Sequence, residues 1–162
     1  MKINAVLIVT ACSVLVGCGQ APPNFDELAA SVRRNRNETS IIISAIQKQP
    51  TLQRLIWSDG NEFITIIGRD GEVADGYREE TKWQPEIQGW IKRLKASGCH
   101  GFDDDREIGL TRLYLDIQTY IAVTSPGPFR EKYSAWSRAG ETDEGYSCID
   151  LGQGWYLTAE NE

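Results

Sequence analysis

Residues 108–123 read IGLTRLYLDIQTYIAV and alternate between apolar and polar side chains. Successive side chains of a β-strand point to opposite faces, so this pattern predicts a strand with one buried face. Sixteen residues is long for a single strand, and we therefore expect a bend or turn near Gln118 and Thr119. The apolar face carries Leu113, Leu115, Ile117, Ile121 and Val123, and the polar face carries Arg112, Tyr114, Asp116, Gln118 and Tyr120.

Further strands are predicted on both sides of this stretch. Residues 52–57 and 62–67 are rich in branched and aromatic side chains, and Ser58-Asp59-Gly60-Asn61 between them indicates a hairpin. Asp70-Gly71 predicts the next turn. Pro126-Gly127-Pro128 interrupts the pattern, after which residues 132–137 and 154–158 are each predicted to form a strand.

Two regions have helical spacing. The first begins after Asn24, which can cap a helix, and ends at Pro50, with a polar interruption at residues 35–38. It is expected to form one long helix or two nearly collinear ones. The second covers residues 81–97 and ends at Gly98. Its apolar stripe consists of Trp83, Ile87, Trp90, Ile91 and Leu94.

The order of these elements predicts the fold class. Strands and helices do not alternate as they do in parallel α/β folds, which favours an α+β fold. We expect an antiparallel sheet of about five strands, with two to three helices packed on one face. Residues 25–162 have the length and composition of a single domain.

The N-terminus has the features of an export signal. Lys2 precedes an uncharged apolar run at residues 5–16, which is too short to span a bilayer permanently. This run closes on Leu15-Val16-Gly17-Cys18, which resembles the lipobox of bacterial lipoprotein precursors. The alternative is an ordinary secretory signal peptide with a coincidental cysteine, although this segment lacks the usual Ala-x-Ala pattern.

The lipobox resemblance implies an anchor and a location. Residues 1–17 would be a signal peptide, Cys18 would carry the lipid, and residues 18–24 would form a short tether to the domain. Gly19, rather than Asp, follows the cysteine. In similar lipoproteins this implies sorting to the outer membrane of the bacterial cell envelope, facing the periplasm.

The charge balance narrows the possible partners. The chain has 23 acidic and 17 basic residues, and loss of Lys2 with the leader would leave a net charge of −7. This balance opposes binding to nucleic acid and favours a cationic protein partner. We expect no cofactor, because no glycine-rich phosphate loop is present in the sequence.

The four cysteines have separate expected fates. Cys12 would leave with the leader and Cys18 would receive lipid, so Cys99 and Cys148 remain. In an oxidising compartment the simplest expectation is a disulfide between them, closing a loop of about 50 residues. A metal site at Cys99-His100 or a catalytic thiol are the alternatives, but zinc would lack suitably spaced further ligands.

Catalytic motifs are weak. His100 is the single histidine and sits in a Ser-Gly-Cys-His-Gly segment, which favours a solvated loop over a general base. Asp103-Asp104-Asp105 with Glu107 is also expected to be a solvated loop. Calcium is the alternative for these acids, but Ile108 stands where a calcium loop needs glycine. We therefore expect neither an enzyme nor a metal site.

Basic residues near the tether suggest a membrane contact. Arg33, Arg34 and Arg36 lie in the first helical region, where each could gain about 1 kcal/mol beside anionic headgroups. The alternative is an ordinary charged helix face.

These observations favour a lipid-anchored envelope lipoprotein with a non-catalytic, protein-binding periplasmic domain. Trp136 and Trp155-Tyr156 are aromatic candidates for the binding face. An inhibitor or immunity protein against a periplasm-acting hydrolase is one alternative. Lys132-Tyr133-Ser134 ahead of Tyr146-Ser147-Cys148 is similar to membrane-bound lysozyme inhibitors, but that family's small all-β barrel does not match the predicted helices. An envelope assembly factor is another alternative.

Intact-mass analysis of the protein purified from its host tests the anchor. We expect a species that begins at Cys18 and carries added fatty-acyl mass, because the lipobox resemblance implies that Cys18 receives the lipid and becomes the N-terminus. A species that retains residues 1–17, or one without any acyl increment, would contradict this prediction.

Overall fold

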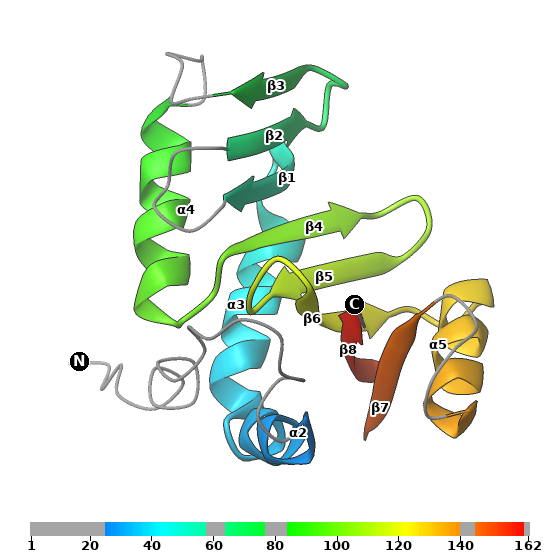
Figure 1. Ribbon diagram of the computed structural model, residues 1–162. Helices are drawn as coiled ribbons and strands as arrows, with labels where there is room; N and C mark the ends of the chain where they lie inside the picture. Colours follow the sequence, from blue (N-terminus) through cyan, green and yellow to red (C-terminus); the bar gives the residue numbers. More distant parts are fainter. Residues whose placement is uncertain (1–24, 58–63, 77–83, 140–144, 161–162) are drawn as a thin grey trace.

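The computed structural model describes residues 25–57, 64–76, 84–139 and 145–160. Its eight strands form one antiparallel sheet in the order β3-β2-β1-β4-β5-β6-β8-β7 (Figure 1). The predicted α+β class is confirmed, but the expectation of about five strands was too low. The strands are β1 (Leu52–Trp57), β2 (Ile64–Gly68), β3 (Val73–Gly76), β4 (Gly101–Asp105), β5 (Leu110–Tyr114), β6 (Thr119–Thr124), β7 (Tyr146–Gly152) and β8 (Trp155–Glu160).

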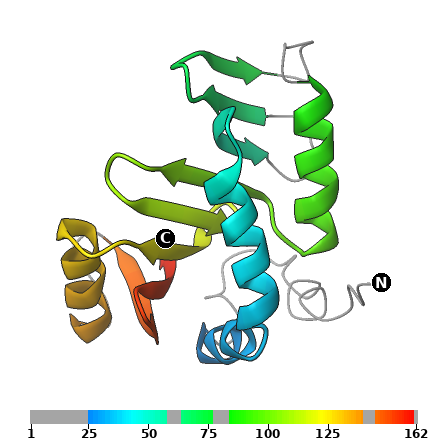
Figure 2. The ribbon, with the colours of Figure 1, turned by 180° about the vertical axis from the view of Figure 1, so that it is seen from behind.

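Four helices are described: α2 (Phe25–Arg34), α3 (Arg36–Lys48), α4 (Gln84–Ala96) and α5 (Pro128–Ala139). Figure 1 shows α3 passing behind the strands, and Figure 2, seen from the opposite side, shows it in front of them. None of the described helices has the length and apolar character needed to cross a membrane.

One row of apolar side chains crosses almost the whole sheet. Directly opposed residues of neighbouring strands share a face, so the strand register places these side chains side by side. Most are fully buried, and each contributes about 1.5–3 kcal/mol by leaving water. In sheet order the row is Ile66, Leu55, Phe102, Leu113, Ile121, Leu157 and Ile149. We call this side of the sheet face A.

Three helices cover face A. Apolar side chains of α2, α3 and α4 join the same core cluster as the row just described, among them Val32, Ile43 and Leu94. The fourth helix, α5, belongs to a second cluster, in which Tyr133 packs with Ala122, Cys148 and others. Ala122 and Cys148 neighbour face A residues along their strands, so they point to the opposite side, face B. The two to three helices expected on one face are present as α2, α3 and α4, whereas α5 is a fourth helix that packs on the other face.

The first helical region breaks at a single residue. Asn35 separates α2 from α3, and its side chain donates to the carbonyl of Ser31 at 3.1 Å. The two helices were predicted to be nearly collinear, and this is wrong. Figures 1 and 2 show α2 nearly end-on, whereas α3 runs along the plane of the page. The break lies at the first residue of the predicted polar interruption, residues 35–38, and the rest of that interruption belongs to α3.

The alternating stretch forms a hairpin, as expected. Strands β5 and β6 are joined by a turn in which Asp116 Oδ1 accepts the backbone N–H groups of Gln118 and Thr119 at 2.8 and 2.6 Å. Leu113, Leu115 and Ile121 are buried, as predicted. Ile117 was assigned to the buried face but is 67% exposed, because it lies in the turn rather than in a strand.

Other predicted elements have mixed outcomes. The β1–β2 hairpin, helix α4 and strand β8 are confirmed within the described residues, while the turn at residues 58–61 and Trp83 lie outside them. Residues 132–137 were wrongly predicted to be a strand and belong to α5. Pro128 occupies the first helical position, where its missing N–H costs nothing, and Phe129, Tyr133 and Trp136 recur at helical spacing.

The acidic segment at residues 103–105 was wrongly predicted to be a solvated loop. It lies in the central strand β4, and its first two side chains are buried on opposite faces. Asp104 is 2% exposed. It receives hydrogen bonds from Arg69 at 2.5 Å and Arg106 at 3.2 Å, and its other oxygen accepts the Thr111 hydroxyl at 2.7 Å. Arg69 and Arg106 therefore neutralise the buried carboxylate of Asp104.

These arginines also tie the end of α3 to the sheet. Arg106 donates to the carbonyls of Gln47 and Gln49, both at 2.6 Å. Arg69, which follows β2, donates to the carbonyl of Gln49 at 3.3 Å. Asp104 is thus the shared acceptor of a network that joins a helix end, the strand β4 and the chain between β2 and β3.

Replacing Asp104 with Asn is expected to lower the free energy of unfolding by about 3–5 kcal/mol, because it leaves two arginines beside a buried neutral group. Urea denaturation at neutral pH measures this change. The matched control is Glu107→Gln, at an exposed acid of the same segment, which should shift stability by no more than about 0.5 kcal/mol. Equal effects of the two substitutions would show that the network does not stabilise the fold.

Candidate functional site

A cleft of about 300 Å³ opens between face B and helix α5. Its floor comes from β5 and β6, one wall comes from α5, and one end comes from the β5–β6 turn with the neighbouring ends of β7 and β8. Most of its lining residues carry an aromatic ring or a charge. They are Arg112, Tyr114, Ile117, Gln118, Tyr120, Phe129, Lys132, Tyr133, Trp136, Tyr146 and Glu160.

The floor is set by the register of β5 and β6. Tyr114 and Tyr120 are directly opposed, and their ring centroids are 5.5 Å apart. The guanidinium of Arg112 lies over the Tyr120 ring, 5.7 Å from its centroid. The alternating pattern predicted that Arg112, Tyr114 and Tyr120 share the polar face of the strands, and the structure confirms that they lie together.

The wall formed by α5 is held to the sheet by aromatic contacts. Tyr133 stacks on Tyr156 with centroids 5.5 Å apart, and its hydroxyl lies 3.3 Å from that of Tyr120. Trp136 stacks on Tyr146, with centroids 5.2 Å apart and ring planes 12° from parallel. The Lys132 Nζ atom lies 4.4 Å from the Trp136 ring centroid. The helix therefore presents both a cation and ring edges to the cleft.

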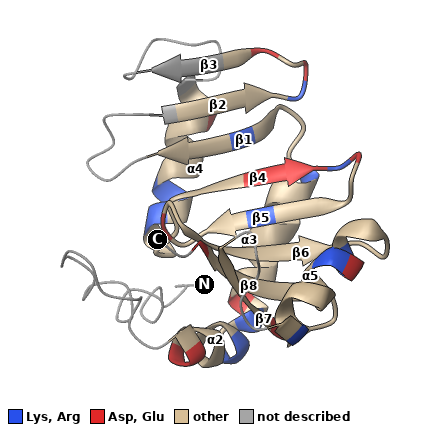
Figure 3. Ribbon diagram, turned by 45° about the vertical axis from the view of Figure 1, so that its right-hand side comes forward, with Lys and Arg blue, Asp and Glu red and all other residues tan. Residues whose placement is uncertain are grey.

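A charged triad borders the floor. Asp103 lies between Arg54 of β1 and Arg112 of β5 in the strand register, and Figure 3 shows acidic β4 between basic positions on these two strands. Arg54 and Arg112 donate to the same Asp103 oxygen, at 2.7 and 3.1 Å. Asp103 is 5% exposed, and its second oxygen has no hydrogen-bond partner, nor do the Nε atoms of the two arginines.

The tyrosines of the floor stay protonated. Burial raises the pKa of Tyr114, and burial together with the adjacent Tyr133 raises that of Tyr120. Burial alone would lower the pKa of Arg112, but the facing Tyr133, Tyr114 and Asp103 outweigh it, and the pKa is raised. Near neutral pH the floor therefore offers a fixed positive charge and neutral hydroxyls, which suits binding rather than proton transfer.

The predicted disulfide is not formed. No disulfide joins Cys99 and Cys148, which are both buried and belong to the separate clusters on face A and face B. The sheet lies between these clusters, so the two thiols cannot meet without rearrangement. Burial raises the pKa of Cys148 to about 11, and its sulfur lies 3.7 Å from the Tyr133 carbonyl. A protonated, buried thiol of this kind is poorly suited to catalysis.

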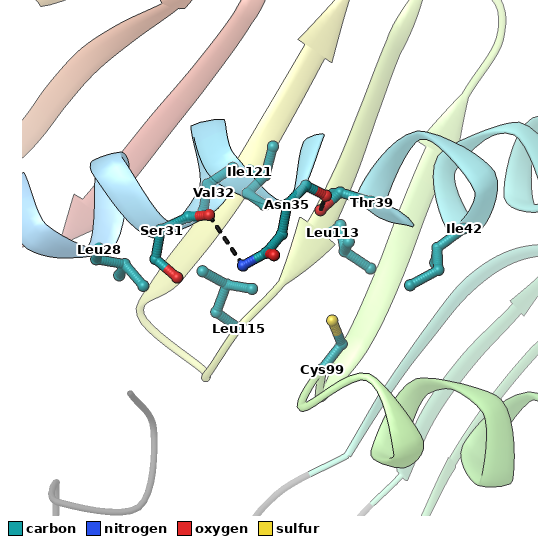
Figure 4. A pocket seen from close by; sticks show the side chains of 10 residues that line it. All are labelled: Leu28, Ser31, Val32, Asn35, Thr39, Ile42, Cys99, Leu113, Leu115 and Ile121. Atoms are coloured by element: carbon teal, nitrogen blue, oxygen red, sulfur yellow. Dashed lines mark hydrogen bonds between the residues drawn. The ribbon is translucent and has the colours of Figure 1, made fainter. Parts of the chain in front are cut away.

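Cys99 borders a small cavity under face A (Figure 4). The cavity measures about 20 Å³, which is room for a single water molecule. Its wall is largely apolar, with polar groups supplied by Ser31, Asn35 and Thr39 at the α2–α3 break. It is too small to serve as a ligand site.

Neither the metal site considered at Cys99-His100 nor the calcium site considered at residues 103–107 gains support from the described residues. The His100 ring stacks on Trp57 with centroids 6.2 Å apart, and His100 is absent from the residues that line the cleft. Within the described residues, no group of three or more histidine, cysteine or acidic side chains could hold a metal ion. Cys18 and the rest of residues 1–24 lie outside the described part of the chain.

Arg33 and Arg36 donate hydrogen bonds to backbone carbonyls of strand β7. Arg33 donates to the carbonyl of Asp150 at 2.7 Å. Arg36 donates to those of Leu151 and Gly152 at 2.8 and 2.9 Å, and it lies over the Trp155 ring at 4.9 Å. Arg34 is exposed. The predicted membrane contact of these arginines stays a prediction, but two of them have a structural role that the sequence did not reveal.

No family model, curated protein or solved structure matches this chain. We therefore infer a function from the cleft and from the segment Leu15-Val16-Gly17-Cys18, which resembles a lipobox.

Replacing Arg36 with Gln is expected to lower the free energy of unfolding by about 1.5–3 kcal/mol, since it removes two charge-assisted hydrogen bonds to carbonyls. Thermal unfolding monitored by circular dichroism measures the loss. Arg34→Gln, two residues away and exposed, removes the same charge and should leave stability nearly unchanged. A comparable loss in both variants would assign the effect to net charge instead.

Proposed function

We propose that this protein is a lipid-anchored lipoprotein of the bacterial cell envelope, whose domain binds a partner protein without catalysing a reaction. The observation that carries the proposal is the cleft between face B and α5. Its lining is rich in tyrosine and includes tryptophan and arginine, the residue types that most often dominate the binding energy of protein interfaces.

The exposure of the cleft residues supports binding. Ile117 stands at the rim and is 67% exposed, while Tyr114, Tyr120, Trp136 and Tyr146 are partly exposed. A partner that covered them would remove apolar surface from water without requiring the domain to rearrange. The aromatic stacks fix the rings in advance, which lowers the entropy lost on binding.

The chemistry of the lining also favours binding over catalysis. The lining residues supply guanidinium, ammonium, phenol, indole and carboxylate groups, and among those that the structure describes none is a serine, cysteine or histidine. The buried tyrosines are protonated near neutral pH, since the ordinary tyrosine pKa already lies well above 7 and burial raises it further. Such a set can donate hydrogen bonds and hold an anion, and it offers no paired nucleophile and base.

The position of the cleft is consistent with a tether at Cys18. The chain enters the described domain at Phe25, and α2 packs its apolar residues into the cluster on face A. The cleft opens on face B, so the helix next to the tether and the cleft occupy opposite faces of the sheet. A partner can then approach the cleft without displacing the helix that follows the anchor.

Site-specific photo-crosslinking in the host tests the proposal. A photoreactive amino acid at Ile117 is expected to capture a partner protein, because this side chain stands at the rim of the cleft. Ile41, on α3, is the matched control, since it is equally apolar and 71% exposed but is absent from the cleft lining.

Adducts at position 117 and not at position 41 would support the cleft as the binding surface. Equal adducts at both positions, or adducts at position 41 alone, would contradict it. Repeated absence of adducts at both positions in cells grown under several conditions would count against the protein-binding class itself.

A further inference from the structure

We propose that the floor of the cleft binds a proline-containing, extended segment of the partner, with the hydroxyls of Tyr114 and Tyr120 donating hydrogen bonds to its backbone carbonyls. This inference rests on the proposed function and specifies the class of segment that the partner presents. It requires no charged group on that segment.

The charge of Arg112 sets the direction of the hydrogen bonds at the floor. The side chains of Tyr114 and Tyr133 are hydrogen-bonding neighbours of its guanidinium, which has only N–H donors and no acceptor. Each of these phenol oxygens therefore turns a lone pair toward Arg112. The hydroxyl hydrogens point away from the cation.

Tyr133 passes this direction on to Tyr120. The two hydroxyl oxygens lie 3.3 Å apart, and either could donate on distance alone. A chain of hydrogen bonds that begins at a cation is strongest when every hydroxyl donates away from it, because each bond polarises the next. Tyr133 therefore donates to Tyr120, and the hydrogen of Tyr120 points onward.

The hydroxyls of Tyr114 and Tyr120 are within reach of a ligand. Both residues line the cleft and are partly exposed, and neither hydroxyl is a buried atom without a hydrogen-bond partner. In the described part of the chain, no acceptor lies within hydrogen-bond distance of the Tyr114 hydroxyl. The floor therefore offers two O–H donors that a ligand with acceptors can satisfy.

Proline supplies acceptors without adding donors. An ordinary peptide brings one N–H group with each carbonyl, and an N–H group that faces the hydroxyl hydrogens would lose its hydrogen bond to water. Proline has a carbonyl and no N–H. In the polyproline II conformation the carbonyls make no internal hydrogen bonds, and segments of this kind dock in grooves lined by aromatic rings.

The rings of the cleft supply the matching apolar surface. The planes of the Tyr114 and Tyr120 rings meet at 51°, with centroids 5.5 Å apart, so the floor is an angled pair of rings. Phe129 lines the cleft from α5, and Ile117 stands at the rim. Pyrrolidine rings are compact and apolar, and they can pack against such rings while the adjacent carbonyls reach the hydroxyls.

The other charged groups lie toward the opposite end of the cleft. Lys132 lies over the ring of Trp136, which stacks on Tyr146, and Tyr146 pairs in the sheet with Glu160. Arg112 itself donates to Asp103 at 3.1 Å. The floor is therefore expected to bind by hydrogen bonds and ring contacts rather than by ion pairs.

The test uses the full-length lipidated protein in detergent micelles. The probes are acetyl-tetraproline-amide, its tetra-alanine and tetra-N-methylalanine counterparts, and chitotriose. The readout is the indole N–H resonance of Trp136, assigned with Trp136→Phe. The proline peptide should bind about tenfold more tightly than the alanine peptide, because it is preorganised and lacks N–H groups. The N-methylalanine peptide, which lacks N–H groups but has no ring, should fall between them.

Tyr114→Phe isolates the proposed hydrogen bond, since it keeps the ring and removes only the hydroxyl. The proline peptide should bind this variant about fivefold more weakly, as expected for the loss of one neutral hydrogen bond. Replacing one peptide carbonyl at a time by a thiocarbonyl, a weaker acceptor, should weaken binding to the wild type at the position that Tyr114 contacts. The same replacement should have no effect in Tyr114→Phe.

Each other outcome overturns the inference. Equal binding of the proline and alanine peptides would remove the proline preference, and an unchanged affinity in Tyr114→Phe would remove the hydroxyl donor. Tighter binding of chitotriose would make the ligand a sugar, and affinities that fall steeply with added salt would make it a charged group. No response to any probe would overturn the proline assignment, while crosslinking at Ile117 would still decide the proposed function separately.

Discussion

Two neighbouring buried aspartates on the central strand determine how this protein is assembled. Asp103 and Asp104 point to opposite faces of β4, and each is paired with two arginines, Asp103 with Arg54 and Arg112, and Asp104 with Arg69 and Arg106. A buried carboxylate is tolerated only when its partners are in place. The pairing of β4 with β1 and β5 is therefore fixed by charge as well as by packing, since a slip of one residue would move each carboxylate to the wrong face.

The two faces of the sheet have different roles: face A carries the main hydrophobic core, and face B carries the cleft. Face A carries the continuous apolar row and is covered by three helices, so it supplies most of the stabilising burial. Face B is covered by one helix at one end, where a smaller aromatic cluster holds α5. The polar strand positions next to that helix form the floor of the cleft. In the proposed function, burial on face A stabilises the sheet, and face B of the same sheet binds the partner.

Local patterns predicted part of this arrangement and missed the rest for identifiable reasons. The alternation in residues 108–123 predicted both faces of the β5–β6 hairpin, including the shared face of Arg112, Tyr114 and Tyr120. Strand β4 was missed because the burial of its aspartates depends on Arg54, Arg69 and Arg112, which only the folded sheet brings beside them. Helix α5 was missed although Pro128 and the spacing of its aromatic residues indicated it. The cleft needs both α5 and the sheet, so it could not be predicted without tertiary structure.

The arginines at the α2–α3 break have a consequence for how copies of this chain meet. Strand β7 is the last strand of the sheet, and three consecutive carbonyls at its end accept hydrogen bonds from Arg33 and Arg36. An open edge of this kind could otherwise template strand addition from a neighbouring molecule. In the lipid-anchored form proposed for this protein, tethered copies would diffuse in two dimensions and collide often, and these occupied acceptors would discourage sheet-to-sheet aggregation.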